Sequence, residues 1–366
     1  MSKAGGSRYF PSLDGLRCLA VGIVMAAHAH VPPLRSGGVG VDIFFVLSGF
    51  LISSILFEEY SRHGRISFGR FYMRRFLRLT PCLWTTVAFF VIVHALLGDP
   101  FPVKDSALAL TYTMNWACAF GYQGEFDGLM HTWSLAIEEQ FYLLWPLLFG
   151  TLVVLARSRA RLALILGIAA IGVGAYRYFL TGHYSAERIY YGLDTHCDGL
   201  LCGAMLVPVA AYLRESALPQ VVHTILGRCL VPLALCGIAV IACKLHWSRL
   251  SMQHFGFTAS AGASGVIVLD LVAGRSSLLR GVLELAPLRW LGKISYGLYL
   301  WHFPIYELIA RLDVIHDWWW LAIIGPTCTV AMASLSYYSV ERYFLRLKTR
   351  FHAQAPAARA PAANAA

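Results

Sequence analysis

The chain has 366 residues, of which 58% are hydrophobic and only 14% charged, and its formal net charge is +10. An average soluble domain is about 25% charged, so this composition excludes a soluble enzyme, a disordered protein and a secreted disulfide scaffold. The nine cysteines include no Cys-x-x-Cys pair and lie mostly in apolar runs. We therefore expect buried thiols, with no metal site and no redox site.

Apolar windows of about twenty residues, the length of a helix that crosses a bilayer, recur along the chain. They cover residues 11–31, 38–57, 79–98, 134–155, 162–180, 195–213, 229–243, 257–273, 294–311 and 318–340. This pattern predicts an all-α, polytopic membrane helix bundle with about ten transmembrane helices. We expect one membrane-embedded domain over residues 1–350 and a disordered Ala/Pro-rich tail over residues 351–366.

Lys and Arg residues are distributed unevenly between the connections. With the N-terminus in the cytoplasm, the cytoplasmic segments carry 22 of them and the opposite side carries 7. The positive-inside rule then predicts that both termini are cytoplasmic (N-in/C-in). Because this distribution accounts for most of the positive charge, we expect the lipid bilayer and no nucleic acid as a partner. The expected location is the cell (inner, cytoplasmic) membrane, as a multi-pass protein.

The first span carries ionisable residues, which are costly in a membrane and by default mark a functional site. Arg17 and His28 are eleven positions apart, so both lie on one face of a helix, about 16 Å apart along its axis. Asp14 lies one turn below Arg17 on the same stripe. The spacing places Arg17 near the cytoplasmic end and His28 near the outer end, and it favours a functional pair over a structural histidine.

Three carboxylates lie about one turn in from the outer side of later spans: Asp42, Glu138 and Asp198. They could converge on His28 if their helices are neighbours. A carboxylate beside a histidine fixes its tautomer and raises its basicity, as general-base catalysis on a hydroxyl requires. The alternative is that these groups make polar contacts between helices.

Arginines gather at the inner end. Arg75 and Arg78 are one turn apart at the start of the third span and can face the same pocket as Arg17. Guanidinium pairs bind phosphate through bidentate hydrogen bonds. An anion site inside and a histidine–carboxylate site outside, about 16 Å apart, would suit a coenzyme A thioester whose acyl arm runs up a channel.

These residues lie in stretches that resemble the acyltransferase-3 family of integral membrane O-acyltransferases. The stretches are FPSLDGLRCLAVGIVMAAHAH (10–30), GVGVDIFFVLSGFLIS (38–53), FYMRRFLRLTP (71–81), TYTMNW (111–116), HTWSLAIEEQFYLLWP (131–146), DTHCDGLLCGAML (194–206) and LGKISYGLYLWHFPIY (291–306), in the family's order. The resemblance implies about ten membrane helices, an acyl-CoA donor bound from the cytoplasm and a carbohydrate or similar hydroxyl acceptor outside.

The resemblance also implies roles for residues. His28 is the expected catalytic histidine of an Arg-x10-His pair with Arg17, and Arg75 and Arg78 form the family's Arg-x-x-Arg motif. Ser48 lies in the SGFL motif, which we place with the acyl-CoA-binding groups together with Asp14. One departure concerns the sixth span, where His196 and Cys197 precede Asp198 although such proteins often carry Arg there.

Aromatic and amide residues in and beside the outer connection 99–133 are candidates for acceptor binding, because they stack on and hydrogen-bond to sugars. They are Asn115, Trp116 and Trp133, to which we add Asp198. An interfacial aromatic belt is the alternative for the tryptophans. His302, before Pro304, could line the channel, but a helix kink with a local polar contact is the interpretation we favour.

The sequence thus predicts a membrane-bound O-acyltransferase that moves an acyl group, in our reading acetyl, from acyl-CoA to a glycan, glycolipid or metabolite hydroxyl. His28 would act as the base, aided by Glu138 or Asp42. Acyl-CoA is a co-substrate, and no cofactor is expected. Transfer through an acyl-enzyme on Ser48 or a tyrosine stays open. The alternative function is a membrane transporter or flippase of a glycan or acyl carrier that uses the same charges as a relay.

Overall fold

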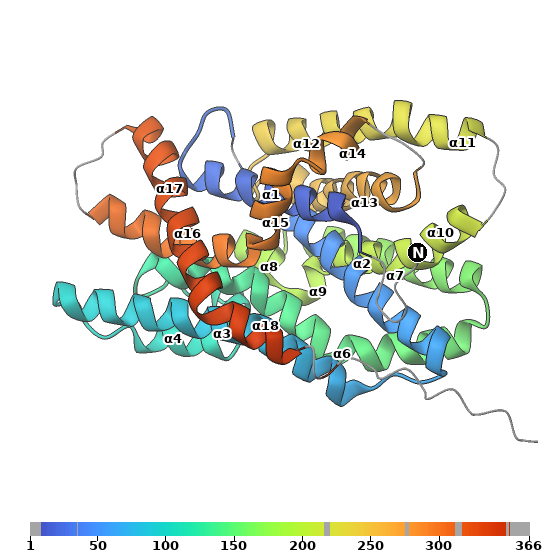
Figure 1. The fold of residues 1–366 in the computed structure, drawn as a ribbon. Coiled ribbons are helices and arrows are strands. Elements are labelled where there is room, and N and C mark those ends of the chain that lie inside the picture. Colours follow the sequence, from blue (N-terminus) through green and yellow to red (C-terminus); the bar gives the residue numbers. More distant parts are fainter. Residues whose placement is uncertain are drawn as a thin grey trace, which may run out of the picture.

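The computed structural model describes residues 9–34, 36–215, 220–274, 278–311, 317–348 and 351. Within these residues the chain is all-α, with an isolated bridge between Thr181 and Tyr184 as the one β-type pairing (Figure 1). This confirms the predicted fold class. The tail expected over residues 351–366 lies outside the described residues, apart from Phe351.

Each of the ten predicted spans contains a long helix. These are α1 (Pro11–His28), α2 (Gly38–His63), α3 (Phe68–Leu97), α6 (Trp133–Ala156), α7 (Arg159–Leu180), α10 (Asp198–Glu215), α12 (Val231–Lys244), α13 (Phe257–Ala273), α16 (Ser295–Arg311) and α17 (Trp318–Ser336). The connections form shorter helices, among them α4 (Val103–Leu110), α5 (Met114–Ala119), α8 (Ala186–Tyr191), α9 (Leu193–His196), α11 (Gln220–Ile225), α14 (Leu278–Leu283), α15 (Ala286–Lys293), α18 (Arg342–Lys348) and the 3₁₀ turn η1 (Asp127–Thr132).

Seven helical segments in the described part of the chain are long and apolar enough to cross a membrane. They are Gly38–His63, Phe68–Leu97, Gly128–Ala156, Arg159–Leu180, Gln220–Lys244, Met252–Ala273 and Trp318–Lys348. The other three predicted spans correspond to α1 and α10, of 18 residues each, and α16, of 17. The protein is therefore a multi-pass membrane protein, whereas the count of ten crossings and the N-in/C-in orientation stay predictions.

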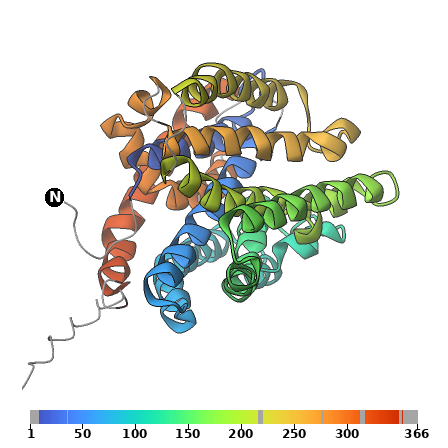
Figure 2. The same ribbon diagram turned by 90° about the vertical axis from the view of Figure 1, so that its right-hand side faces the viewer.

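Helix α2 is the centre of the bundle and packs against α1, α6, α10 and α13. In Figure 1 it runs beside α1 between the α11–α13 region above and α3 and α6 below, and Figure 2 shows α12 and α13 above α6 and α7. Glycines allow the close contact between α2 and α10. A Cβ added to Gly49 of α2 would lie 1.9 Å from the carbonyl oxygen of Leu200, and a Cβ added to Gly203 of α10 would lie 2.0 Å from the carbonyl oxygen of Val46. Small residues thus let the α2 and α10 backbones touch, as is typical of membrane helices.

Candidate active site

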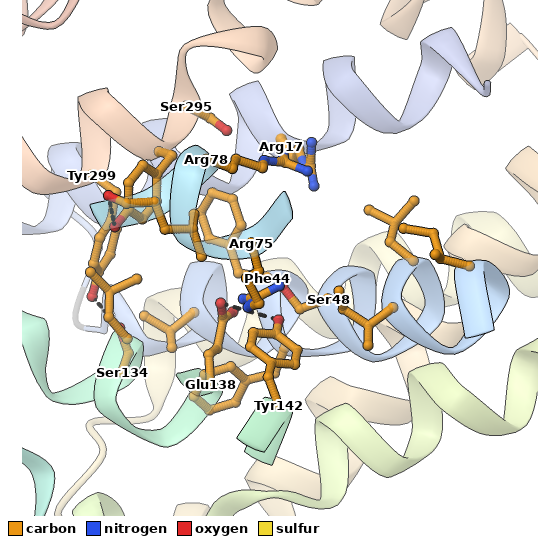
Figure 3. A pocket seen from close by; sticks show the side chains of 18 residues that line it. Arg17, Phe44, Ser48, Arg75, Arg78, Ser134, Glu138, Tyr142, Ser295 and Tyr299 are labelled. Carbon is orange, nitrogen blue, oxygen red and sulfur yellow. Dashed lines mark hydrogen bonds between the residues drawn. The ribbon is translucent and has the colours of Figure 1, made fainter. Parts of the chain in front are cut away.

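A pocket enclosing about 780 Å³, in part open to solvent, lies between α1, α2, α3, α6 and α16. Its polar lining comes from Arg17, Ser48, Arg75, Arg78, Ser134, Glu138, Tyr142, Ser295, Tyr296 and Tyr299, and the rest of the wall is apolar (Figure 3). Five residues predicted for the site, three arginines with Glu138 and Ser48, therefore share one pocket. Since the pocket draws on five separate helices, its shape depends on the whole bundle.

The three arginines do not have equivalent partners. Arg75 donates two hydrogen bonds to Glu139 Oε1, at 3.0 Å from Nε and 2.8 Å from Nη2, and its guanidinium lies 3.2 Å from the centroid of the Tyr142 ring. Arg17 Nη1 is 3.7 Å from Asp14 Oδ1. Arg78 is exposed and makes no ion pair with a carboxylate in the described ranges. Its charge is thus free to bind an anionic ligand, while Arg75 is held by its neighbours.

Glu138 faces the same pocket from α6. Its Oε1 accepts a hydrogen bond from the Ser48 hydroxyl at 3.0 Å, and its Oε2 accepts one from the Tyr142 hydroxyl at 3.3 Å. These bonds tie α2 to α6 and fix the carboxylate in the pocket wall, where Figure 3 shows it beside Arg75. The contact between Glu138 and Tyr142 matches the one-turn spacing of the two residues.

Tyr299 and Ser134 form the wall at another end of the pocket. Their hydroxyl oxygens are 2.6 Å apart, and the Tyr299 hydroxyl also donates to the His131 carbonyl oxygen at 2.9 Å. Behind this wall lie three histidines, because the Tyr299 ring centroid is 5.4 Å from the ring centroids of both His131 and His302. The histidines therefore lie next to the pocket without lining it.

His28 is the last residue of α1 and belongs to this histidine group. Its Nδ1 is 3.1 Å from Nε2 of His302, and its ring meets Phe303 edge-on with centroids 4.7 Å apart. His302 is fully buried, whereas His28 keeps part of its surface exposed. Our interpretation of His302 as a local kink residue missed its contact with His28, and His131 was not singled out. The signal that could have found His302 is a histidine inside a long apolar segment, whereas His131 lies just before the span predicted at 134–155.

The outer carboxylates do not converge on His28, which corrects one expectation. Asp42 Oδ1 accepts from His196 Nε2 at 3.0 Å, and Asp198 Oδ2 lies 2.9 Å from Arg177 Nη2. Glu138 binds the hydroxyls described above. The physical reason is the helix arrangement: Asp42 points from α2 toward α9, while His28 packs against α16. Asp42 and Asp198 are both buried and act between helices.

Of the residues expected to bind the acceptor, Asn115 and Trp116 share one hydrogen-bond network through Gln140. Asn115 is fully buried, donating to the Tyr191 carbonyl at 3.2 Å and accepting from Gln140 at 2.8 Å. Trp116 Nε1 donates to Gln140 Oε1 at 3.1 Å. Trp133 packs among aromatic rings, with its centroid 4.6 Å from that of Tyr190. Of this set, Trp116 is the residue with a partly exposed side chain. Because the Asn115 amide is buried, it is better placed to hold the connections together than to touch a sugar.

The protein resembles known sequences over nearly its whole length. A family model described as an acyltransferase domain matches residues 10–338. The chain belongs to the acyltransferase-3 family. That family consists of membrane-bound O-acyltransferases, and the resemblance inferred from the motifs is confirmed. Among the described residues of this family member, no group of three or more His, Cys, Asp or Glu has a geometry that could hold a metal ion.

Curated relatives of this acyltransferase-3 chain are O-acetyltransferases by name. It is 32% identical over 352 residues to the peptidoglycan O-acetyltransferase OatA of Listeria monocytogenes, an alignment that covers 91% of this chain and 55% of the relative. It is 35% identical over 355 residues to the putative peptidoglycan O-acetyltransferase YrhL of Bacillus subtilis, covering 92% and 55%. The O-acetyltransferase OatA of Staphylococcus aureus is 32% identical over 362 residues, with 93% and 58% covered.

The chain spans about half the length of these curated relatives. No solved structure matches it significantly.

Proposed function

We propose that this protein transfers an acetyl group from cytoplasmic acetyl-CoA to a hydroxyl of a carbohydrate on the far side of the membrane. The observation that carries the proposal is the pocket that Arg17, Arg75 and Arg78 share, whose Tyr299 wall packs against His302, the hydrogen-bond neighbour of His28. The names of the relatives support the acetyl group and the carbohydrate acceptor, since they describe acetylation of peptidoglycan.

The donor site follows from the charges. A phosphate group of the donor would bind at Arg78, which has no carboxylate partner in the described residues. Arg17 and Arg75, which line the same pocket, are paired with Asp14 and Glu139. The apolar residues of α2 that line the pocket, including Phe44 and Leu51, would contact the arm of the donor. In the predicted N-in orientation, the arginines open to the cytoplasm and His28 lies about 16 Å further along α1, toward the acceptor side.

The chemistry proposed is general-base catalysis. His28 removes the proton of an acceptor hydroxyl while the hydroxyl oxygen attacks the thioester carbonyl carbon. The new carbon–oxygen bond forms, the carbon–sulfur bond breaks, and the sulfur of CoA leaves with the proton that His28 had taken. Glu138 and Ser48 lie in the pocket wall, on the side of the donor, and Asp14 orients Arg17. Asp42, Asn115, Trp133 and Asp198 hold the surrounding helices and connections.

The test is release of CoA thiol from acetyl-CoA by purified protein in detergent, with and without soluble peptidoglycan fragments. We expect release by the wild type and its loss in His28→Ala. The matched control is His30→Asn, because His30 is exposed two residues away and Asn accepts its positive φ of 56°. Full activity of His28→Ala would refute the role of His28. Acetyl-CoA binding without release by any variant, together with glycan movement across vesicles, would favour the transporter.

A further inference from the structure

We propose that His302 of α16 is the positioning residue for His28, because it fixes the ring nitrogen on which His28 carries its proton. The proposal rests on the proposed function of His28 as the base. It concerns a residue 274 positions away in the sequence, which reaches His28 because α16 packs against α1.

The hydrogen-bond chain begins at a backbone carbonyl. His302 Nδ1 lies 2.5 Å from the carbonyl oxygen of Tyr299, one turn earlier in α16. A carbonyl oxygen only accepts hydrogen bonds, so His302 Nδ1 must carry the proton. A neutral imidazole has a single N–H, and therefore His302 Nε2 is an acceptor.

That acceptor determines the state of His28. His302 Nε2 faces His28 Nδ1 at 3.1 Å. Two nitrogens at this distance attract each other only if one donates, and His302 Nε2 has no proton to give. His28 Nδ1 therefore carries the proton, and His28 Nε2 keeps its lone pair free. In this arrangement His28 Nε2 is the basic nitrogen that meets the acceptor hydroxyl. The hydrogen bond from His28 Nδ1 to His302 sets this tautomer.

The neutral state of His302 follows from its surroundings. The side chain is fully buried, and in the described ranges no carboxylate forms an ion pair with it. Its ring neighbours are His28, His131, Tyr299, Phe303 and Tyr306. A buried cation without a counter-charge is strongly disfavoured, so an imidazolium at His302 is not expected at neutral pH.

The role of His302 resembles that of the third group in nucleophile–base systems, which orients the base without touching the substrate. In the reaction, the proton of the acceptor hydroxyl moves to His28 Nε2 and then to the departing sulfur. His28 Nδ1 keeps its own proton and its bond to His302 throughout. An imidazole in water without such a partner favours the proton on Nε2, which would leave His28 unable to accept the hydroxyl proton there.

His131 provides a matched comparison within the same cluster. It is also buried, its ring centroid is 5.1 Å from that of His302, and neither of its ring nitrogens has a hydrogen-bond partner in the described part of the chain. His131→Phe makes the same substitution as His302→Phe at a second buried position of the cluster. It leaves the chain of hydrogen bonds from Tyr299 through His302 to His28 intact.

The experiment uses the full chain in detergent micelles, labelled with ¹⁵N-histidine. Nitrogen chemical shifts report the tautomer of His28, whose signals are assigned by their loss in His28→Asn. In the wild type we expect the proton on Nδ1. In His302→Phe, which keeps a ring but no acceptor, we expect a shift toward Nε2–H. The kcat of CoA release should fall about tenfold to a hundredfold, with the KM for acetyl-CoA unchanged.

Two further variants make the test specific. His302→Gln offers a carbonyl oxygen that accepts from His28 Nδ1, so it should retain the wild-type tautomer and most of the kcat. His302→Leu, which also has no acceptor, replaces His302→Phe if that variant does not fold. His131→Phe should leave the tautomer of His28 unchanged. A proton on His28 Nε2 in the wild type, an unchanged kcat in His302→Phe, or an equal tautomer shift in His131→Phe would overturn the proposal. No CoA release by the wild type would instead refute the proposed function, and the tautomer would still decide the role of His302.

Discussion

Replacement of Arg78 should separate donor binding from catalysis. Arg78 lines the pocket, is exposed, and has no carboxylate partner in the described residues, so its guanidinium is available for a phosphate of the donor. A hydrogen bond to a charged group contributes about 1.5–3 kcal/mol. At about 1.4 kcal/mol per factor of ten, Arg78→Ala should raise the KM for acetyl-CoA about tenfold to 150-fold while kcat changes little.

Arg75→Ala should behave differently, although Arg75 belongs to the same motif. Its guanidinium is bonded twice to Glu139 and stacked on Tyr142, and both partners would lose it. We expect a loss of thermal stability in addition to a higher KM, because removing one member of a partly buried pair leaves the other without its partner. In Arg78→Ala, thermal stability should stay at the wild-type value.

The assay is CoA release at varied acetyl-CoA and fixed acceptor, followed by the reverse titration, with thermal unfolding of every variant. Arg65→Ala is the matched control, since Arg65 is an exposed arginine in the turn just before α3 and lies outside the pocket. Arg78→Lys should recover part of the loss, because it keeps the charge without the bidentate geometry. An equal rise in the KM of both substrates, or the same rise in Arg65→Ala, would refute the assignment of Arg78 to the donor.

Three further predictions concern the surrounding structure. Arg177→Ala should destabilise the protein by about 3–5 kcal/mol, seen as a lower unfolding midpoint, because it leaves the buried Asp198 carboxylate without its partner; unchanged unfolding would contradict this. The hydrogen bond from the His94 ring holds the pKa of the Asp99 carboxyl below 3.8. The ionised Asp99 therefore contributes to stability above pH 3.8, and this contribution is lost as the pH falls through the lower pKa of the folded state. Asp99→Asn should flatten this acid dependence of the unfolding temperature. If transfer is direct, Ser48→Ala should lower kcat by less than about tenfold, since it removes one hydrogen bond. Complete loss of activity, together with loss of a covalent acetyl label on the protein, would instead establish an acyl-enzyme.

The gathering of the arginines could be predicted from the sequence. Charges inside apolar windows are visible without a structure, and helix geometry fixes the depth of a residue within its own span. Arg17 on α1 and Arg75 and Arg78 on α3 were expected in one pocket, and they line one. Glu138, by contrast, was expected near the outer end of its span as a partner of His28, and it lines the arginine pocket instead.

The partners of these residues could not be predicted. Depth says nothing about which helices are neighbours, and for that reason Asp42 was expected near His28 although it binds His196. The same limit applies to His302, which meets His28 from a distant part of the chain. Span counting has its own limit, because α1, α10 and α16 are short and carry polar residues where they line the interior.

The hydrogen-bonded wall of Tyr299 and Ser134 bears on membrane permeability. An enzyme whose two substrates lie on opposite sides of a bilayer needs a continuous path for one acyl group, yet an open path would also conduct protons and small solutes. Tyr299 and Ser134 close the pocket with two hydroxyl groups 2.6 Å apart, each held by side-chain or backbone bonds rather than by covalent structure. If the proposed function is correct, the acyl arm would pass this wall by breaking hydrogen bonds that re-form behind it, and transfer would then leave the ion gradients of the cell intact.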